Sequence, residues 1–365
     1  MKQRLFVTLS LAGLAMSTFG ATKPKTAIKS LNKTTIQQPT YTEWHDLQVN
    51  AINRFPLHTN FFTYPADDWV SEKDGKIVSK DILHMNKAES KYCLSLDGTW
   101  KFNWVANADQ RPTDFYKEDL DDSKWKTMNL PGIWEMNGFG DPEYVNVGFG
   151  WRGHFDQQPP AVPTKDNHVG SYRRIIDIPA NWDGKQVVAH FGSVTSNIYL
   201  YVNGKFAGYA EDSKVAAEFD ITPYLKKGKN LIAFQTFRWC DGSWDEDQDF
   251  WRLSGVARES YLFARDAQLH LEDIRVTPDL VNNYKDGVLN ISAKVKGTGK
   301  LNFILFDKEG KQVTTATGLA KNGTANITMN VENPHKWNAE TPYLYTLQVS
   351  LSSALKNGNM KSASM

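Results

Sequence analysis

The chain has 365 residues, and its 42 Lys and Arg against 41 Asp and Glu leave a formal net charge of +1. This balance excludes the clustered basic excess that nucleic-acid-binding proteins need. Hydrophobic residues make up 41% and charged residues 23%, a globular composition that excludes wholesale disorder, and the length favours two domains.

The first twenty residues have the pattern of a secretory signal peptide. Lys2 and Arg4 precede an apolar run from Leu5 to Met16, and small residues follow it. That run is too short to span a bilayer, and no later run approaches the necessary length. We therefore expect an exported protein, periplasmic or secreted, with no membrane partner. Residues 21–42 are polar and rich in Lys and Thr, and are predicted to form a flexible lead.

Short strands separated by turn residues are predicted throughout 43–264. The clearest local signal is Asn203-Gly204, because this pair favours a type I′ hairpin between the β-rich runs 197–202 and 205–209. Further strands are predicted over 95–104, 169–178, 185–191 and 231–239. Helical periodicity is scarce here. The segment is therefore predicted to be an antiparallel jelly-roll sandwich.

The composition changes near Arg265, where a second set of strands begins. These strands are predicted over 269–276, 287–295, 300–306, 323–331 and 344–351. Their spacing suits an immunoglobulin-like sandwich over 265–351. Residues 352–365 form an unmatched tail without strand alternation, which predicts an unpaired edge and an incomplete second sandwich. The predicted fold class is all-β, a jelly roll followed by an incomplete immunoglobulin-like sandwich.

The segment 241–252 holds the most unusual chemistry in the chain. Five carboxylates lie within nine residues, and Trp239, Trp244 and Trp251 flank or interrupt them. A solvated charge run is the simplest interpretation, but such a loop has no need of three indoles. Carboxylates beside aromatic rings suit a hard cation or the hydroxyl groups of a sugar. A glycosidase pair of carboxylates would also need walls around the scissile bond, so no catalytic residue is predicted.

Two other features stay open at the level of sequence. A second loop, 133–147, mixes aromatic, acidic and Asn side chains, and its asparagines suit either backbone capping or ligand contact. Cys93 and Cys240 are the two cysteines, and an exported protein allows them to form a disulfide or to remain two buried free thiols.

Several motifs together resemble the N-terminal part of β-galactosidases of glycoside hydrolase family 2, over about 43–351. They are NRFPLH at 53–58, LDGTWKF at 96–102, PEYVN at 142–146, RWCDGS through DQDFWRLSG at 238–255, and ENPHKW with ETPYLY at 332–345. The resemblance implies a jelly-roll sugar-binding domain, an immunoglobulin-like domain and then a TIM barrel that carries both catalytic glutamates. This chain lacks the barrel, so it is expected to be a truncated fragment of a glycosidase that is inactive by itself.

The resemblance also assigns roles to two residues of this sequence. It implies that Asn146 contacts galactose hydroxyls, and that Asp249 contacts the sugar and a monovalent cation, usually Na⁺, with Mg²⁺ as a second candidate ion. The two side chains are expected to lie at the same end of the first sandwich. The implied partners are β-galactoside sugars, the missing barrel and further copies of the chain in a homo-oligomer.

Two alternatives remain beside the fragment of an enzyme. The chain could act as a free-standing carbohydrate-binding module, with Trp134, Trp244, Trp251 and Asp249 as a sugar platform. It could also be a non-functional remnant that folds poorly because its second sandwich lacks an edge strand.

Overall fold

The computed structural model describes residues 38–73, 76–79, 85–146, 148, 151, 158–353 and 362–364. The predicted signal peptide and the predicted lead up to residue 37 lie outside the described residues. The described chain is all-β, with two sandwiches and short 3₁₀ turns between strands. Among the described residues, no helix has both the length and the apolar character needed to cross a bilayer.

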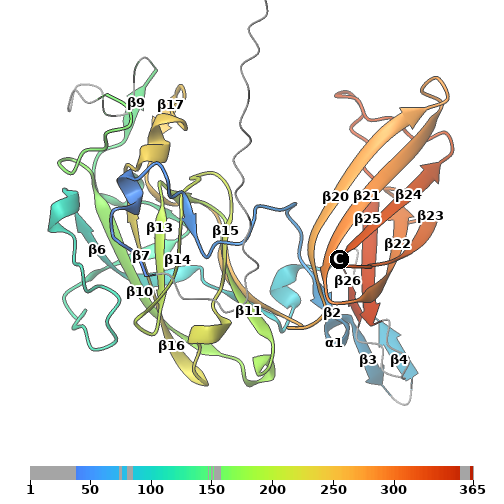
Figure 1. The fold of residues 1–365 in the computed structure, drawn as a ribbon, viewed down its shortest axis with the longest axis horizontal. Coiled ribbons are helices and arrows are strands. Elements are labelled where there is room, and N and C mark those ends of the chain that lie inside the picture. The colour runs from blue at the N-terminus through green and yellow to red at the C-terminus, as the bar shows by residue number, and fades with distance from the viewer. Residues whose placement is uncertain are drawn as a thin grey trace, which may run out of the picture. The chain divides into compact units, whose positions relative to one another are not determined.

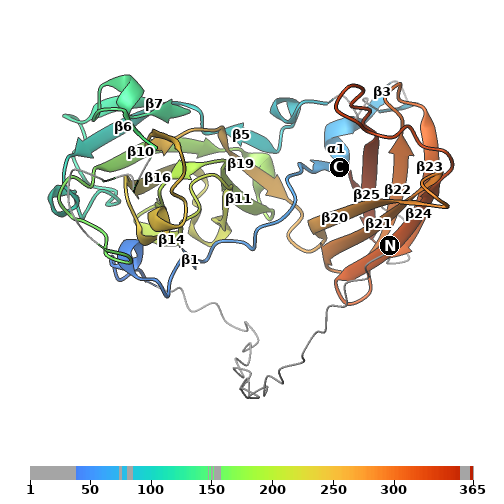
Figure 2. The same cartoon turned by 90° about the horizontal axis from the view of Figure 1, so that it is seen from above.

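The first sandwich contains a seven-stranded and a four-stranded antiparallel sheet (Figures 1 and 2). The larger sheet runs in the order β1 (Ala51–Ile52), β14 (Lys205–Ala210), β13 (Ile198–Val202), β16 (Gly228–Phe237), β10 (Val169–Ile178), β6 (Gly98–Val105) and β7 (Lys126–Leu130). The smaller sheet runs in the order β15 (Ala217–Asp220), β11 (Gln186–Phe191), β19 (Ser260–Arg265) and β5 (Cys93–Ser95). A third, small sheet joins β12 (Val194–Thr195), β18 (Gly255–Val256) and β8 (Gly132–Ile133).

The larger sheet is buried on both faces, which explains the uninterrupted apolar run of β13. Ile198 and Leu200 pack into the core between the two sheets. Tyr199 and Tyr201 point to the other face, where they pack with Trp44 and other side chains of the preceding loops in a second core. Because successive strand residues face opposite sides, burial of both faces requires apolar residues at every position.

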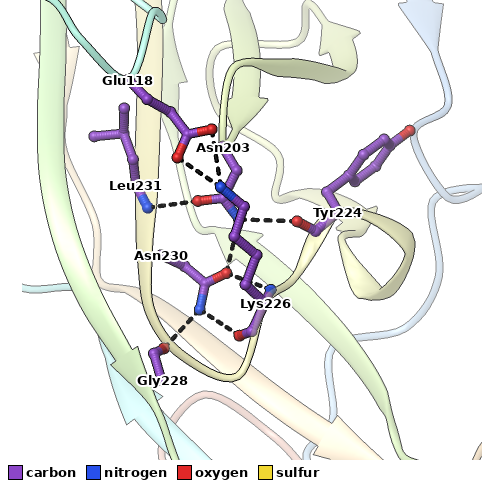
Figure 3. Close-up of polar contacts among 7 residues, drawn as sticks. All are labelled: Glu118, Asn203, Tyr224, Lys226, Gly228, Asn230 and Leu231. Carbon is purple, nitrogen blue, oxygen red and sulfur yellow. Dashed lines mark hydrogen bonds and ion pairs between the residues drawn. The ribbon is translucent and has the colours of Figure 1, made fainter.

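The predicted Asn203-Gly204 hairpin is confirmed between β13 and β14. Asn203 has φ 50° and Gly204 has φ 75°, the left-handed values that a type I′ turn requires. The Asn203 side chain is buried and bonds to Asn230, the Tyr224 carbonyl and the Leu231 amide (Figure 3). The side-chain amide of Asn230 in turn holds the loop from Lys226 to Gly228. The turn is therefore fixed by buried side-chain bonds as well as by its backbone.

The Asp97-Gly98 turn joins two sheets and does not form a hairpin. β5 before it pairs with β19 in the smaller sheet, whereas β6 after it pairs with β10 and β7 in the larger one. Gly98 has φ 108°, which a side chain would strain. The chain therefore uses this glycine to turn a corner between the two layers of the sandwich.

The second sandwich packs a five-stranded sheet against a three-stranded one around a separate core. The first sheet has the order β2 (Tyr64–Pro65), β26 (Ser362–Ser364), β25 (Thr346–Ser353), β22 (Gly299–Phe306) and β23 (Gln312–Leu319). The second has the order β20 (His270–Val281), β21 (Asp286–Lys296) and β24 (Thr324–Val331). In β22, Leu301, Phe303 and Leu305 point into the core and alternate with less buried residues, as a two-sheet sandwich requires.

Three features of this sandwich differ from the sequence prediction. The tail was expected to lack strands, but Ser362–Ser364 forms β26 and pairs with both β25 and β2. β2 belongs to this sheet, although the sequence prediction places its segment in the jelly roll. It is followed by α1 (Ala66–Trp69) and by the hairpin of β3 (Val70–Lys73) and β4 (Lys76–Ser79). β23 was not predicted, because its Thr-rich sequence lacks an apolar alternation.

Candidate functional site

The candidate site is a two-stranded ribbon formed by β9 (Glu143–Val145) and β17 (Phe250–Arg252), which Figure 1 shows side by side at one end of the first sandwich. The strands are antiparallel, and the ladder pairs Val145 with Phe250 and Tyr144 with Trp251. Asn146 and Asp249 occupy the next position on each strand, beyond the Val145–Phe250 pair. The structure therefore brings the two sequence-predicted residues to the same end of the ribbon.

Alternation along the ribbon gives it one outward and one inward face. Tyr144, Asn146, Asp249 and Trp251 are exposed, whereas the residues between them are half-buried or buried. Residues two apart on a strand share a face, and paired residues on neighbouring strands share it too. The outward face therefore combines two aromatic rings with an amide and a carboxylate. We call these four residues the outward face of the ribbon.

A hydrogen bond links the polar and aromatic parts of this face. Tyr144 Oη donates to Asp249 Oδ1 at 2.6 Å, and this carboxylate raises the pKa of the Tyr144 phenol. The Tyr144 and Trp251 rings lie 5.7 Å apart between centroids, and each side chain is about half exposed, at 51% and 55%. Sequence reasoning did not select Tyr144, although the spacing Tyr-x-Asn and Asp-x-Trp at 144–146 and 249–251 shows the two-residue period of a strand.

Two buried arginines contact the inward face, one from the end of β16 and one within the ribbon. Arg238, which follows β16, forms an ion pair with Glu143 at 3.0 Å, and its guanidinium lies over the Trp239 ring. Arg252 pairs with Asp247 and also donates to the carbonyl of Val145 across the ribbon. Each of these two buried guanidinium groups therefore has a charged partner, as buried charges require.

The tryptophans predicted as a sugar platform are used in different ways. Trp134 is fully buried and donates to the Tyr172 hydroxyl within the core, so it cannot contact a ligand. Trp244 packs edge-on against Trp151 and donates to the carbonyl of Ala161. Of the three platform tryptophans, Trp251 alone is an exposed large apolar side chain. The expectation for Trp134 is therefore wrong, because sequence does not show which indole fills a core.

A second acidic cluster, which sequence reasoning missed, lies at the start of segment 241–252. Ligand atoms of Glu211, Cys240 and Asp241 lie within 4.8 Å of one another, and all three residues are buried. Asp241 Oδ2 is buried without a hydrogen-bond donor. Burial raises the pKa of Glu211 to about 8. The hydrogen bond from Tyr209 lowers this pKa, and the negative charge of Asp241 raises it. The two carboxyl groups can thus share either a proton or a cation.

The two cysteines do not form a disulfide. Cys93 and Cys240 are both free, and Cys240 is buried. Burial raises the pKa of the Cys240 thiol well above its usual range, so it stays protonated beside the carboxyl pair. A protonated thiol is a poor ligand for a hard cation, so the carboxylate oxygens are the ligand atoms of interest there.

The comparisons with known proteins agree on one family. The model for "Glycosyl hydrolases family 2, sugar binding domain" matches residues 93–266, and the model for "Glycosyl hydrolases family 2" matches residues 269–361. The β-galactosidase of Priestia megaterium is 36% identical over 327 residues, which cover 86% of this chain and 30% of that protein. The β-galactosidase large subunit of Leuconostoc lactis is 31% identical, over 83% of this chain and 48% of that protein.

Solved structures confirm the fold. The β-glucuronidase of Bifidobacterium dentium superposes with a TM-score of 0.57 at 17% identity, over 75% of this chain and 47% of that chain. A β-glucuronidase of Bacteroides uniformis gives a TM-score of 0.57 at 21% identity, over 74% of this chain and 31% of that chain. The chain spans 30% and 29% of the length of two β-galactosidases that it matches. It therefore belongs to glycosyl hydrolase family 2 and corresponds to an N-terminal portion of the β-galactosidases of that family.

Proposed function

We propose that this chain is the sugar-contacting part of a retaining β-galactosidase, which releases terminal non-reducing β-D-galactose, and that it is inactive by itself. The outward face of the ribbon supports this proposal. Asp249 and Asn146 offer hydrogen-bond acceptors and donors to sugar hydroxyls, and Trp251 with Tyr144 offers aromatic surface to the apolar side of a pyranose ring.

Cleavage itself requires groups that the matched family portion does not supply. A retaining glycosidase uses an acid and a nucleophile whose carboxyl groups lie about 5–5.5 Å apart. In the family resemblance both are glutamates of a TIM barrel of roughly 250 residues. That barrel is the proposed partner of this chain, and β-galactosides are the proposed substrates. Homo-oligomer formation is proposed from the same resemblance, and export from the signal-peptide pattern of the first twenty residues.

The donor set at the ribbon fits a monovalent cation such as Na⁺ in part. Asp249 has one carboxylate oxygen bound to Tyr144 and a second oxygen left for a cation or a hydroxyl, and Asn146 adds an amide oxygen at the same end. Hard cations prefer such oxygen ligands and need several of them. Bound there, the cation would supply positive charge for a sugar hydroxyl oxygen, and Asp249 would hold it in place.

A divalent ion such as Mg²⁺ fits the Glu211–Asp241 pair better. A hollow of about 210 Å³ beside the pair is lined by further carboxylates, including Asp46, Asp212 and Asp245. When Glu211 loses its proton, the two neighbouring carboxylates repel each other, and a cation between them would remove that repulsion. A cation held by Glu211 and Asp241 would neutralise the pair and fasten the start of segment 241–252.

Calorimetry with D-galactose tests the proposal at the ribbon. We expect weak binding that needs Na⁺ and disappears in Asp249→Asn. Asp119→Asn is the control, because Asp119 is an exposed aspartate of the first sandwich outside both the outward face and the carboxylate hollow. Equal binding by wild type and Asp249→Asn would contradict the proposal. Purified chain should not hydrolyse an aryl β-galactoside, and turnover abolished by Asp249→Asn would contradict its inactivity.

The same titration addresses the free-standing carbohydrate-binding module. A single half-exposed indole beside Tyr144 is a small platform, and in the proposed enzyme a further domain would complete the pocket. Micromolar affinity of the chain alone for galactosides would favour the module over the fragment of an enzyme.

A further inference from the structure

We propose that Tyr144 is a positioning residue that fixes the Asp249 carboxylate for its ligand. The hydrogen bond from Tyr144 Oη occupies Oδ1 of Asp249 at 2.6 Å. The second carboxylate oxygen is then the atom presented to a sugar hydroxyl or a cation. This inference rests on the proposed function of Asp249, and neither the family models nor the relatives assign a role to Tyr144.

The ribbon places this tyrosine where it can orient an otherwise exposed carboxylate. Tyr144 pairs directly with Trp251, and Asp249 lies two residues before Trp251 on the same face. The phenol of Tyr144 therefore reaches from its paired position opposite Trp251 to the end of the ribbon where Asp249 lies. Contact with the Trp251 ring limits the rotamers that the Tyr144 side chain can adopt. Within the described residues, the Asp249 side chain makes one hydrogen bond, the one that it accepts from Tyr144.

Orientation matters here because Asp249 is exposed. An exposed carboxylate samples several rotamers, and a ligand that needs one of them must overcome that loss of freedom on binding. A charge-assisted bond from the hydroxyl of Tyr144, whose ring contacts Trp251, restricts the carboxylate before the ligand arrives. The inward face of the ribbon is already held by the ion pair of Arg238 with Glu143 and by the bond of Arg252 to the Val145 carbonyl. Tyr144 adds a corresponding contact on the outward face.

Tyr144→Phe is the informative variant, because it removes the hydroxyl and keeps the ring beside Trp251. Tyr343→Phe is the matched control, since Tyr343 Oη donates to Glu309 Oε2 at 3.1 Å on the second sandwich. The first measurement is carbon-13 NMR of the full chain labelled at the aspartate carboxyl carbon, with the Asp249 signal identified by its loss in Asp249→Asn. We expect this signal to shift in Tyr144→Phe and to stay in place in Tyr343→Phe. An unshifted signal in Tyr144→Phe would overturn the inference.

The second measurement is binding of sodium ions, followed by sodium-23 line broadening, and of D-galactose by calorimetry. We expect Tyr144→Phe to weaken both by roughly threefold to tenfold at an unchanged thermal midpoint, from the loss of one hydrogen bond to a charged group. Binding as tight as wild type in Tyr144→Phe, with loss of binding in Asp249→Asn, would overturn the positioning role and leave the proposed function standing. If wild type binds neither probe, the proposed function fails, and the carbon-13 signal decides the inference on Tyr144.

Discussion

Arg238 and Glu143 form an ion pair at 3.0 Å that joins the end of β16 to the first residue of the ribbon. The arginine side chain is 6% exposed and the glutamate side chain 19%, so both charged groups are largely desolvated. Arg238 therefore couples the rigid seven-stranded sheet to the strand that carries Tyr144 and leads into Asn146. Both this pair and the three-residue ladder hold the candidate site in position.

Arg238→Met should loosen the ribbon, because it removes the ion pair that joins Glu143 to the end of β16. Breaking a fully buried pair costs about 3–5 kcal/mol, and the partial exposure of Glu143 lowers our expectation to about 2 kcal/mol of unfolding free energy. Hydrogen exchange of the amides at 143–145 should quicken in the same variant. Lys226→Met, which breaks the exposed pair with Glu118 shown in Figure 3, is the control and should cost less than about 1 kcal/mol. Unchanged exchange in Arg238→Met would show that the ladder alone holds the ribbon.

His58 and His190 both bind the buried carboxylate of Glu218, at 2.9 Å and 2.8 Å, which predicts a pH dependence of stability. Hydrogen bonds from the two histidines outweigh burial and lower the pKa of Glu218 to about 2, and the bond to Glu218 raises the pKa of His58. Because the carboxyl pKa is lowered in the folded state, Glu218 stabilises the fold at pH values above 4.5, the pKa of the unfolded state. This stabilisation is lost as the pH falls toward 2. A raised histidine pKa adds stability below 6.5 that is lost as the pH rises through the folded value.

The contribution of this cluster should therefore be greatest between pH 4.5 and pH 6.5. Glu218→Gln should lose about 2 kcal/mol at pH 5.5 in urea unfolding, and less at a pH above the raised pKa of His58, where that imidazole is neutral. Glu272→Gln is the control, since Glu272 pairs with Lys294 at 3.5 Å on an exposed strand. A loss in Glu218→Gln that is the same at both pH values would rule out the histidine charge as its source.

The Glu211–Asp241 pair predicts that Mg²⁺ stabilises the chain more at high pH. With its pKa raised to about 8, Glu211 keeps its proton in the folded state well above its unfolded value of 4.5, so this stability is lost as the pH rises through 8. A divalent cation replaces that proton, and its effect on the thermal midpoint should grow from pH 6 to pH 8.5. Glu211→Gln should remove the Mg²⁺ effect, and Glu118→Gln, at an exposed carboxylate, should retain it. An equal effect of Mg²⁺ in both variants would place the ion elsewhere.

Local patterns predicted the parts of the fold that depend on local chemistry. The turn at Asn203-Gly204 and the strand Val169–Ile178 follow directly from residue type and apolar runs. β2 and β26 could not be found this way, because strands of two and three residues have no period, and their pairing joins opposite ends of the chain. The predicted jelly-roll and immunoglobulin-like sandwiches are confirmed as the fold class.

The candidate site could be predicted in its residues but not in its register. Asn146 and Asp249 came from the family resemblance, and their meeting depends on the pairing of Val145 with Phe250, which no local pattern specifies. Trp134 and Trp251 look alike in sequence, since both stand beside acidic and turn residues. Only packing separates them, because Gly170 and Phe102 enclose the Trp134 ring while Trp251 has no such cover.

The buried asparagine pair at the other end of the sandwich gives the last prediction (Figure 3). Asn203 Nδ2 donates to Asn230 Oδ1 at 2.7 Å and to the Tyr224 carbonyl, and Asn203 Oδ1 accepts from the Leu231 amide at 2.9 Å. Asn203→Ala would remove the hydrogen bonds that Asn203 makes to the Tyr224 carbonyl and the Leu231 amide, which costs about 1–3 kcal/mol for a typical buried group. The variant also places alanine at φ 50°, a backbone strain of roughly 1 kcal/mol.

Asn322→Ala separates these two costs. Asn322 has φ 53° in the exposed turn between β23 and β24, so it shares the backbone conformation of Asn203 without its burial. We expect Asn203→Ala to lower the unfolding free energy by about 3 kcal/mol and Asn322→Ala by about 1 kcal/mol, measured by urea unfolding. Equal losses in the two variants would mean that the turn is fixed by its backbone alone. A larger loss in Asn203→Ala would show that buried amide bonds hold the hairpin in place.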